Sequence, residues 1–250
     1  MIEIKNLYKA FDSKPILKGV STTFKEGKTS LIIGQSGSGK TVLMKCLVGL
    51  LEPDSGAVLY DGEDFTSLSN RERTGIRKKI GMLFQGSALF DSLTVEENVI
   101  FPLDMFNKGM SKSEKIKRAH FCLDRVNIQN ANHLYPAEIS GGMKKRVAIA
   151  RAIANKPNYL FCDEPNSGLD PQTAIVIDKL ISEITREFNI TTVVNTHDMN
   201  SVMESGDHVI FLYKGDLWWE GNAEQILSSG NKEVESFVYA SELMMKLKSD

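Results

Sequence analysis

The chain has 250 residues, and its 30 lysine and arginine residues nearly balance its 32 aspartate and glutamate residues, which gives a formal net charge of −2. Nucleic-acid-binding proteins usually carry a basic excess, so this balance argues against a nucleic-acid partner. The sequence also lacks a signal peptide, an apolar run of the ~20 residues that span a bilayer, and a CxxC cysteine pair, so we expect a soluble, cytoplasmic protein.

The first quarter of the chain predicts short strands that lead into a glycine-rich turn. Ile2 and Ile4 alternate with charged residues, as in a half-buried strand, and Phe11 follows in a polar stretch. Residues 22–24 and 29–33 predict two strands joined by a tight turn, and residues 58–60 predict another. The strand at 29–33 enters the segment Gly34-Gln35-Ser36-Gly37-Ser38-Gly39-Lys40-Thr41, after which apolar residues from Val42 onwards predict a helix.

A strand, a glycine-rich turn and a helix form the context in which this segment binds phosphate. The glycines permit a tight turn, and the amide groups from about Gly37 to Thr41 can point at one anion beside the positive end of the helix. Lys40 would reach the β- and γ-phosphates, and the Thr41 hydroxyl would bind Mg²⁺. The alternative is a flexible Gly/Ser turn, which the flanking strand and helix disfavour. The segment alone does not distinguish kinases, GTPases and motor ATPases.

The middle of the chain predicts a helical insertion. Residues 80–84 form a short apolar run that ends at Gln85. Beyond it, Thr94–Glu97 and Ser111–Glu114 both fit the capping-box pattern that begins a helix. We therefore expect an inserted helical subdomain over residues 87–136, within an α/β core of residues 1–86 and 137–228. Residues 229–250 are expected to form a C-terminal helical tail.

Two later strands end in polar residues that can act on a phosphate. Residues 158–162 and 191–194 predict buried strands, separated by a helix whose apolar residues recur between 177 and 188. Asp163 would hold Mg²⁺ at the end of the first strand, and Glu164 would polarise an attacking water. His197 follows the second strand and could orient that water. The alternatives are that the two acids only cap the next helix and that the histidine is structural.

Strands that alternate with helices, followed by a hairpin over residues 209–219, predict an α/β fold. Its sheet should be mainly parallel and covered by helices, with an antiparallel portion near the N-terminus. A terminal helix is expected around residues 234–244.

The order of these motifs resembles the nucleotide-binding subunit of ABC transporters, which are P-loop NTPases. The resemblance rests on Gly34 to Thr41, Gln85, Ser140-Gly141-Gly142, Asp163-Glu164, Gly168-Leu169-Asp170 and His197, in this order. It implies ATP and Mg²⁺ as cofactors, with Glu164, His197 and Gln85 in catalysis and with Thr41, Gln85 and Asp163 at the metal. It further implies a homodimer that sandwiches ATP between its two subunits. The nucleotide-binding residues that it implies are Phe11 (on the adenine), Gly34, Gln35, Ser36, Gly37, Ser38, Gly39, Lys40, Thr41, Val42 and, across the dimer, Ser140, Gly141, Gly142 and Asp170.

A finer resemblance is to the Mla-type ATPases of phospholipid transport between Gram-negative membranes. It rests on residues 85–95, Phe101-Pro102-Leu103 and Ser140-Gly141-Gly142-Met143. It implies an integral membrane permease, an MCE-type lipid-binding protein and a peripheral location on the inner face of the inner membrane. The segment from Gly86 to Phe106 follows Gln85 and has more apolar residues than two short surface helices need, so we expect it to bind the permease. The alternative is that these residues form the core of the helical subdomain. The alternatives are the ATPase of another importer, such as a methionine-type one, a soluble ABC ATPase without a transport role, and a regulatory module that binds ATP without hydrolysing it.

Overall fold

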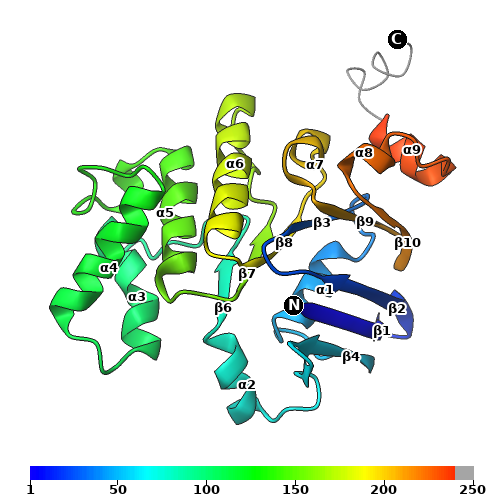
Figure 1. The fold of residues 1–250 in the computed structure, drawn as a ribbon, viewed down its shortest axis with the longest axis horizontal. Coiled ribbons are helices and arrows are strands. Elements are labelled where there is room, and N and C mark those ends of the chain that lie inside the picture. Colours follow the sequence, from blue (N-terminus) through cyan, green and yellow to red (C-terminus); the bar gives the residue numbers. More distant parts are fainter. Residues whose placement is uncertain (240–250) are drawn as a thin grey trace.

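The computed structural model describes residues 1–239, which form two β-sheets and the helices that pack on them (Figure 1). The smaller sheet is antiparallel, with the strand order β2-β1-β4-β5. Its strands are β1 (Ile2–Phe11), β2 (Lys14–Phe24), β4 (Ser55–Tyr60) and β5 (Glu63–Asp64). The predicted strand at 22–24 is therefore the end of a longer one. The polar stretch after Phe11 is a hairpin turn, in which Asp12 and Ser13 have φ angles of 47° and 63°.

The larger sheet has the strand order β10-β9-β3-β8-β7-β6, in which only the edge strand β10 is antiparallel to its neighbour. Its strands are β3 (Thr29–Ile33), β6 (Ile80–Leu83), β7 (Tyr159–Asp163), β8 (Thr191–Asn195), β9 (His208–Tyr213) and β10 (Asp216–Gly221). Strands β3 and β8 are buried along their whole length, as expected for central parallel strands with helices on both faces. The predicted α/β fold, with a mainly parallel sheet and an antiparallel N-terminal portion, is confirmed.

Helix α1 fixes the glycine-rich turn between the two sheets. Its buried residues Leu43, Met44 and Leu47 belong to one apolar cluster with residues of β1, β2 and β4 on one side and of β7, β8 and β9 on the other. Because α1 is enclosed in this way, the turn that precedes it is held at the carboxyl end of β3. The described helices are α1 (Lys40–Leu47), α2 (Asn70–Arg77), α3 (Val95–Phe106), α4 (Lys112–Arg125), α5 (Gly141–Ala154), α6 (Pro171–Glu187), α7 (Met199–Ser205), α8 (Ala223–Ile226) and α9 (Lys232–Val238), together with the 3-10 turn η1 (Pro136–Glu138).

Helices α3 and α4 lie beside α5, on the side of the molecule away from the smaller sheet (Figure 1). Each begins at a predicted capping box: Thr94 Oγ1 accepts a hydrogen bond from the Glu97 amide at 3.2 Å, and Ser111 Oγ accepts one from the Glu114 amide at 3.3 Å. The sequence analysis missed α2, although Ser69 forms a third capping box there. The boundaries of the inserted subdomain stay a prediction.

Helix α9 covers the first half of the predicted terminal helix, and the predicted residues beyond 239 lie outside the described part of the chain. Val234 and Val238 of this helix are buried, and Phe237 packs on Phe211 of β9 with ring centroids 5.4 Å apart. Within residues 1–239, no helix combines the length and apolar character needed to cross a membrane.

Candidate functional site

The glycine-rich turn between β3 and α1 depends on glycine at two positions. Gly34 has a φ angle of 146°, and a Cβ atom there would lie 2.3 Å from the carbonyl oxygen of Leu212. Gly39 has a φ angle of 110°, and a Cβ atom there would lie 3.0 Å from the carbonyl oxygen of Ile16. A side chain at Gly34 would collide with the backbone of β9, and one at Gly39 would be strained by its φ angle and crowded against β2. The turn is therefore locked against both sheets while its amide groups remain available to a ligand.

Lys40 folds back over this turn. Its side chain is only 9% exposed, and its Nζ donates hydrogen bonds to the carbonyl oxygens of Gly34 at 2.7 Å and Gln35 at 3.2 Å. Burial lowers the pKa of Lys40, while the nearby Glu164 and Asp163 carboxylates oppose that shift. Phosphate oxygens are stronger hydrogen-bond acceptors for an ammonium group than neutral carbonyls are, so Lys40 is well placed to exchange these carbonyls for a phosphate.

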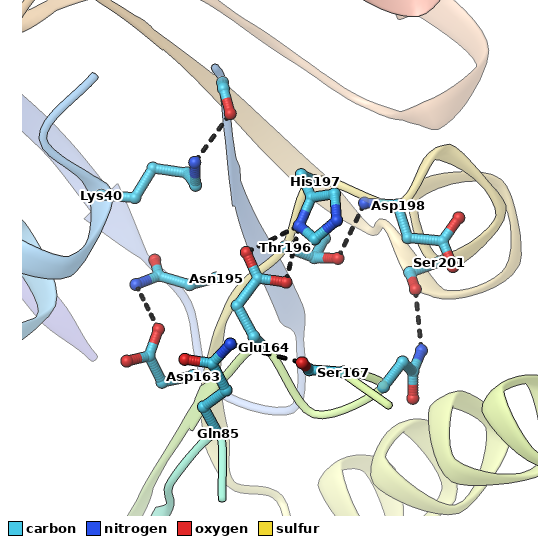
Figure 2. Close-up of polar contacts among 12 residues, drawn as sticks. Lys40, Gln85, Asp163, Glu164, Ser167, Asn195, Thr196, His197, Asp198 and Ser201 are labelled. Atoms are coloured by element: carbon cyan, nitrogen blue, oxygen red, sulfur yellow. Dashed lines mark hydrogen bonds and ion pairs between the residues drawn. The ribbon is translucent and has the colours of Figure 1, made fainter. Parts of the chain in front are cut away.

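Glu164 and His197 meet in front of the turn (Figure 2). The His197 Nδ1 atom lies 2.9 Å from each carboxylate oxygen of Glu164. Glu164 has a positive φ angle of 47°, and its amide donates to the carbonyl oxygen of Asn195 at 3.0 Å, which ties the end of β7 to the end of β8. The His197 side chain is 68% exposed, so its other ring nitrogen remains accessible.

Asp163 is held in place by Asn195, which the sequence analysis did not single out. The Asn195 Nδ2 atom donates to Asp163 Oδ1 at 3.1 Å (Figure 2). Asn195 is fully buried at the end of β8, directly beside Asp163 in the parallel register of the sheet. Its position inside an apolar strand, where an amide needs a buried partner, was the available signal.

Gln85 follows β6 at the same edge of the sheet. Two basic side chains of α5 hydrogen-bond to the backbone of Gln85 and of the residues that follow it. The Gln85 Nε2 atom donates to Ser167 Oγ at 3.3 Å, and its carbonyl oxygen accepts a hydrogen bond from the buried Lys145. Arg151 of α5 donates to the carbonyl oxygens of Ser87 at 2.7 Å and Ala88 at 2.6 Å. The sequence analysis did not single out either cation, and it missed this attachment.

These elements enclose a cavity of about 1260 Å³. The predicted residues that line it are Gly34, Gln35, Ser36, Gly37, Gly39, Lys40, Thr41, Val42, Gln85, Glu164 and His197. Ser236, Phe237 and Val238 of α9 also line it, which the sequence did not indicate. Ser38 is buried beneath the turn, and Asp163 is half-buried behind Glu164.

Phe11 does not line the cavity. It lies at the exposed end of β1, with the Lys9 Nζ atom 5.4 Å from the centre of its ring, whereas Ile16 of β2 reaches the cavity wall. An adenine contact for Phe11 therefore stays a prediction.

Ser140, Gly141, Gly142 and Asp170 form a second group outside the cavity. Ser140 caps α5 by accepting a hydrogen bond from the Met143 amide at 3.2 Å, and Asp170 caps α6 by accepting one from the Thr173 amide at 3.0 Å. The two helix starts touch, because a Cβ atom on Gly142 would lie 2.9 Å from Thr173 Cγ2. One chain thus holds two separate anion-attracting places, the glycine-rich turn and the start of α5.

Within residues 1–239, no three His, Cys, Asp or Glu side chains cluster closely enough to hold a metal ion. A cation bound here would need other oxygen donors, as Mg²⁺ does when it takes substrate phosphates and a hydroxyl. The three cysteines are buried and free, as expected for apolar core residues.

Comparison with known proteins identifies the family. A family model described as ABC transporter matches residues 17–167. The chain is 39% identical over 234 residues to the methionine import ATP-binding protein MetN of Rhizobium johnstonii, covering 94% of this chain and 64% of that one. It is 38% identical over 240 residues to the intermembrane phospholipid transport system ATP-binding protein MlaF of Haemophilus influenzae, covering 95% of this chain and 90% of that one.

Solved structures of ABC transporter cassettes have the same fold as this chain. The dimeric ABC transporter cassette MJ0796 superposes with a TM-score of 0.81 at 37% identity, covering 89% of this chain and 99% of that one. A post-hydrolysis state of the same cassette, bound to ADP and Pi, gives a TM-score of 0.80 at 36% identity. The chain cbiO1 from Clostridium perfringens is part of an ABC transporter complex, and it gives a TM-score of 0.84 at 30% identity over 99% of this chain. The chain therefore belongs to the ABC transporter family, as an ABC-type ATPase.

Proposed function

We propose that this ABC-type ATPase binds ATP on the turn from Gly34 to Thr41 and hydrolyses it with Glu164 and His197. The observation that carries this proposal is the contact between Glu164 and His197 at the wall of the cavity that Lys40 lines. Lys40 supplies positive charge to the β- and γ-phosphates, the Glu164 carboxylate polarises a water, and His197 holds it in line through hydrogen bonding.

Thr41, Asp163 and Gln85 are the residues that would hold Mg²⁺. Their hydroxyl, carboxylate and amide oxygens are the donors that this hard cation prefers, and all three residues belong to elements at the carboxyl edge of the larger sheet. When bound, the ion neutralises charge that develops on the phosphate oxygens. The protein's own contribution is to fix these donors: the Asn195 amide orients Asp163, and Lys145 holds the backbone of Gln85.

A homodimer would complete the site. The start of α5 at Ser140 and Gly141 lies outside the cavity that the turn lines, so one chain offers its two anion-attracting places to different phosphates. Two chains related by a twofold axis can each present the start of α5 to the ATP on the other chain's turn. The solved MJ0796 cassette, which is dimeric, is consistent with this arrangement.

The conformational change that hydrolysis drives would be transmitted to a membrane permease through the segment from Gly86 to Phe106. Val99 and Leu103 of this segment are buried core residues, but Phe90 is 42% exposed and Met105 is 52% exposed. Arg151 in the last turn of α5 fastens the beginning of the segment to this helix, and Lys145 near its start holds the Gln85 carbonyl, so movement at Gln85 would reach this surface and α5 together. Exposed apolar side chains beside a helix suit a permease helix laid into a groove.

Phospholipid is the cargo that we favour, with an MCE-type lipid-binding protein as a further partner and a location on the inner face of the inner membrane. The support is the resemblance of residues 85–95 and 101–103 to Mla-type ATPases and the 38% identity to MlaF of Haemophilus influenzae. The second candidate cargo is a small solute such as methionine, which the 39% identity to MetN of Rhizobium johnstonii supports.

Detergent co-purification from native membranes tests this function. The wild-type chain should recover one integral membrane permease together with a lipid-binding protein and phospholipid, and Phe90→Glu or Met105→Glu should lose that permease. Leu50→Glu is the matched control, because Leu50 is 60% exposed but lies outside the segment. Recovery of a methionine-type permease without lipid would overturn the phospholipid proposal. Equal recovery by all variants would overturn the proposed docking surface.

A further inference from the structure

Asp178 is a buried carboxylate that forms one corner of a triangle of hydrogen bonds beside the cavity. It belongs to α6 and is 4% exposed. Its Oδ2 atom accepts a hydrogen bond from Asn166 Nδ2 at 2.7 Å and another from Ser201 Oγ at 2.8 Å. The triangle is closed by a third hydrogen bond of 3.0 Å, from Asn166 Nδ2 to Ser201 Oγ.

The triangle joins the two loops that carry Glu164 and His197. Asn166 stands two residues after Glu164 and lines the cavity. Ser201 is fully buried in α7, four residues after His197 (Figure 2). Asp198 caps α7 by accepting a hydrogen bond from the Asn200 amide at 2.8 Å, so the His197 loop and α7 are continuous and firmly connected. Asp178 therefore contacts the Asn166 loop and helix α7 from a third, separate element.

A buried carboxylate is a costly way to fill this space. Desolvation raises the pKa of Asp178 to about 6, against the hydrogen bonds from Ser201 and Asn166, which lower it. The carboxylates of Asp198 and Glu204 on the α7 side raise it further. Among residues 1–239, no lysine or arginine pairs with Asp178, although Lys179 next to it pairs with Glu204 at 3.4 Å. An apolar side chain in its place would leave the Asn166 amide and the Ser201 hydroxyl without this acceptor. What the carboxylate offers in exchange is one oxygen that can bind two donors from two loops at once.

We propose that Asp178 is a positioning residue for hydrolysis, which sets the contact between Glu164 and His197 by holding the Asn166 loop against α7. This inference rests on the proposed catalytic roles of Glu164 and His197. The hydrogen bonds of the triangle join only Asn166, Asp178 and Ser201, and those of Lys40 go to Gly34 and Gln35. Loss of the triangle should therefore leave ATP binding intact. It should slow the chemical step, because reacting groups displaced by about 1 Å can cost about 100-fold in rate.

The experiment measures kcat and KM for ATP with the purified full chain. Asp178→Ala and Ser201→Ala should lower kcat about tenfold or more at unchanged KM, after correction for the fraction of sites that bind ATP. Asp178→Asn keeps an acceptor oxygen and should retain more activity than Asp178→Ala. Ser182→Ala is the matched control, since Ser182 is another buried residue of α6 whose hydroxyl has no hydrogen-bond partner in the described part of the chain.

Two results would overturn the positioning role: a wild-type kcat in Ser201→Ala and Asp178→Ala, or a loss fully explained by fewer binding-competent sites. Glu164→Gln is measured in parallel to separate this inference from the proposed function. If Glu164→Gln turns over ATP normally, the assignment of the catalytic residues is wrong. If it is inactive while the Asp178 and Ser201 variants are normal, only the positioning role fails.

Discussion

The Glu164 carboxylate is bridged by the His197 imidazole, whose Nδ1 lies 2.9 Å from both carboxylate oxygens. The contact ties the end of β7 to the loop after β8, two strands that are neighbours in the larger sheet. Because one ring nitrogen is engaged in this way, the other is the one left to meet a phosphate or water. The two residues should therefore act as a unit.

The first prediction concerns this pair. Glu164→Gln and His197→Ala should each lower kcat about 100-fold or more, since about 100-fold is the lower end of the range for losing a positioned acid–base group. Residues that act as a unit are non-additive, so the double variant should be scarcely slower than the worse single variant. Steady-state ATPase rates of the three variants test this. If the fold-loss in kcat of the double variant equals the product of the two single fold-losses, the residues act independently.

The second prediction concerns Lys40. Lys40→Ala removes the only cation whose hydrogen bonds the structure places on the glycine-rich turn within residues 1–239, so productive ATP binding should be lost. Lys45→Ala is the control, because Lys45 is an exposed lysine of the same helix. Equilibrium binding of a fluorescent ATP analogue distinguishes them. Near-normal affinity in Lys40→Ala would refute the phosphate-binding role.

The third prediction is that Gly141 acts on the partner subunit's nucleotide. A Cβ atom on Gly141 would meet only Leu169, at 3.9 Å, so Gly141→Asp should fold while placing negative charge where a phosphate would bind. Lys40→Ala and Gly141→Asp should each be inactive alone. An equal mixture should recover up to about a quarter of wild-type activity, because half of the dimers keep one intact site of two. Full activity of Gly141→Asp alone would contradict the proposed role.

The fourth prediction is a pH dependence of stability. The pKa of Asp178 is raised from 3.8 to about 6 in the folded chain, so its stabilising contribution is complete below about pH 4 and is lost as the pH rises through 6. Asp178→Asn does not titrate. Its melting temperature relative to wild type should therefore rise between pH 5 and pH 7.5, with a full effect of at most about 3 kcal/mol. A difference that stays constant over this range would contradict the raised pKa.

Much of the site could be predicted because the carboxyl ends of parallel strands lie at the same edge of a sheet. Strands β3, β8 and β7 are neighbours, so Lys40, His197 and Glu164, which follow them, converge. Residues that act from helix interiors could not be predicted in this way. Asp178 and Lys145 are buried and hydrogen-bonded, but in the sequence each is one polar residue on a helix, which usually indicates a solvent-exposed position.

Predictions of the fold failed where local signals were weak. The β1–β2 hairpin turns on Asp12 and Ser13, not on the Asn-Gly or Asp-Gly pair that commonly marks a two-residue turn. Helix α2 has a strongly polar sequence, so apolar periodicity gave no indication of it, and only the capping box at Ser69 did. Tertiary packing, which places α1 between the two sheets, is also invisible to a reading of local pattern.

The most direct test of the account is the mass of Glu164→Gln in solution with and without ATP. This variant should bind ATP without hydrolysing it, and the bound nucleotides should hold two chains together. Size-exclusion chromatography with light scattering should give the 27.8 kDa monomer without nucleotide and twice that mass with Mg²⁺ and ATP. Lys40→Ala should stay monomeric in both conditions. A Glu164→Gln protein that remains monomeric at saturating ATP would contradict the composite site on which the account depends.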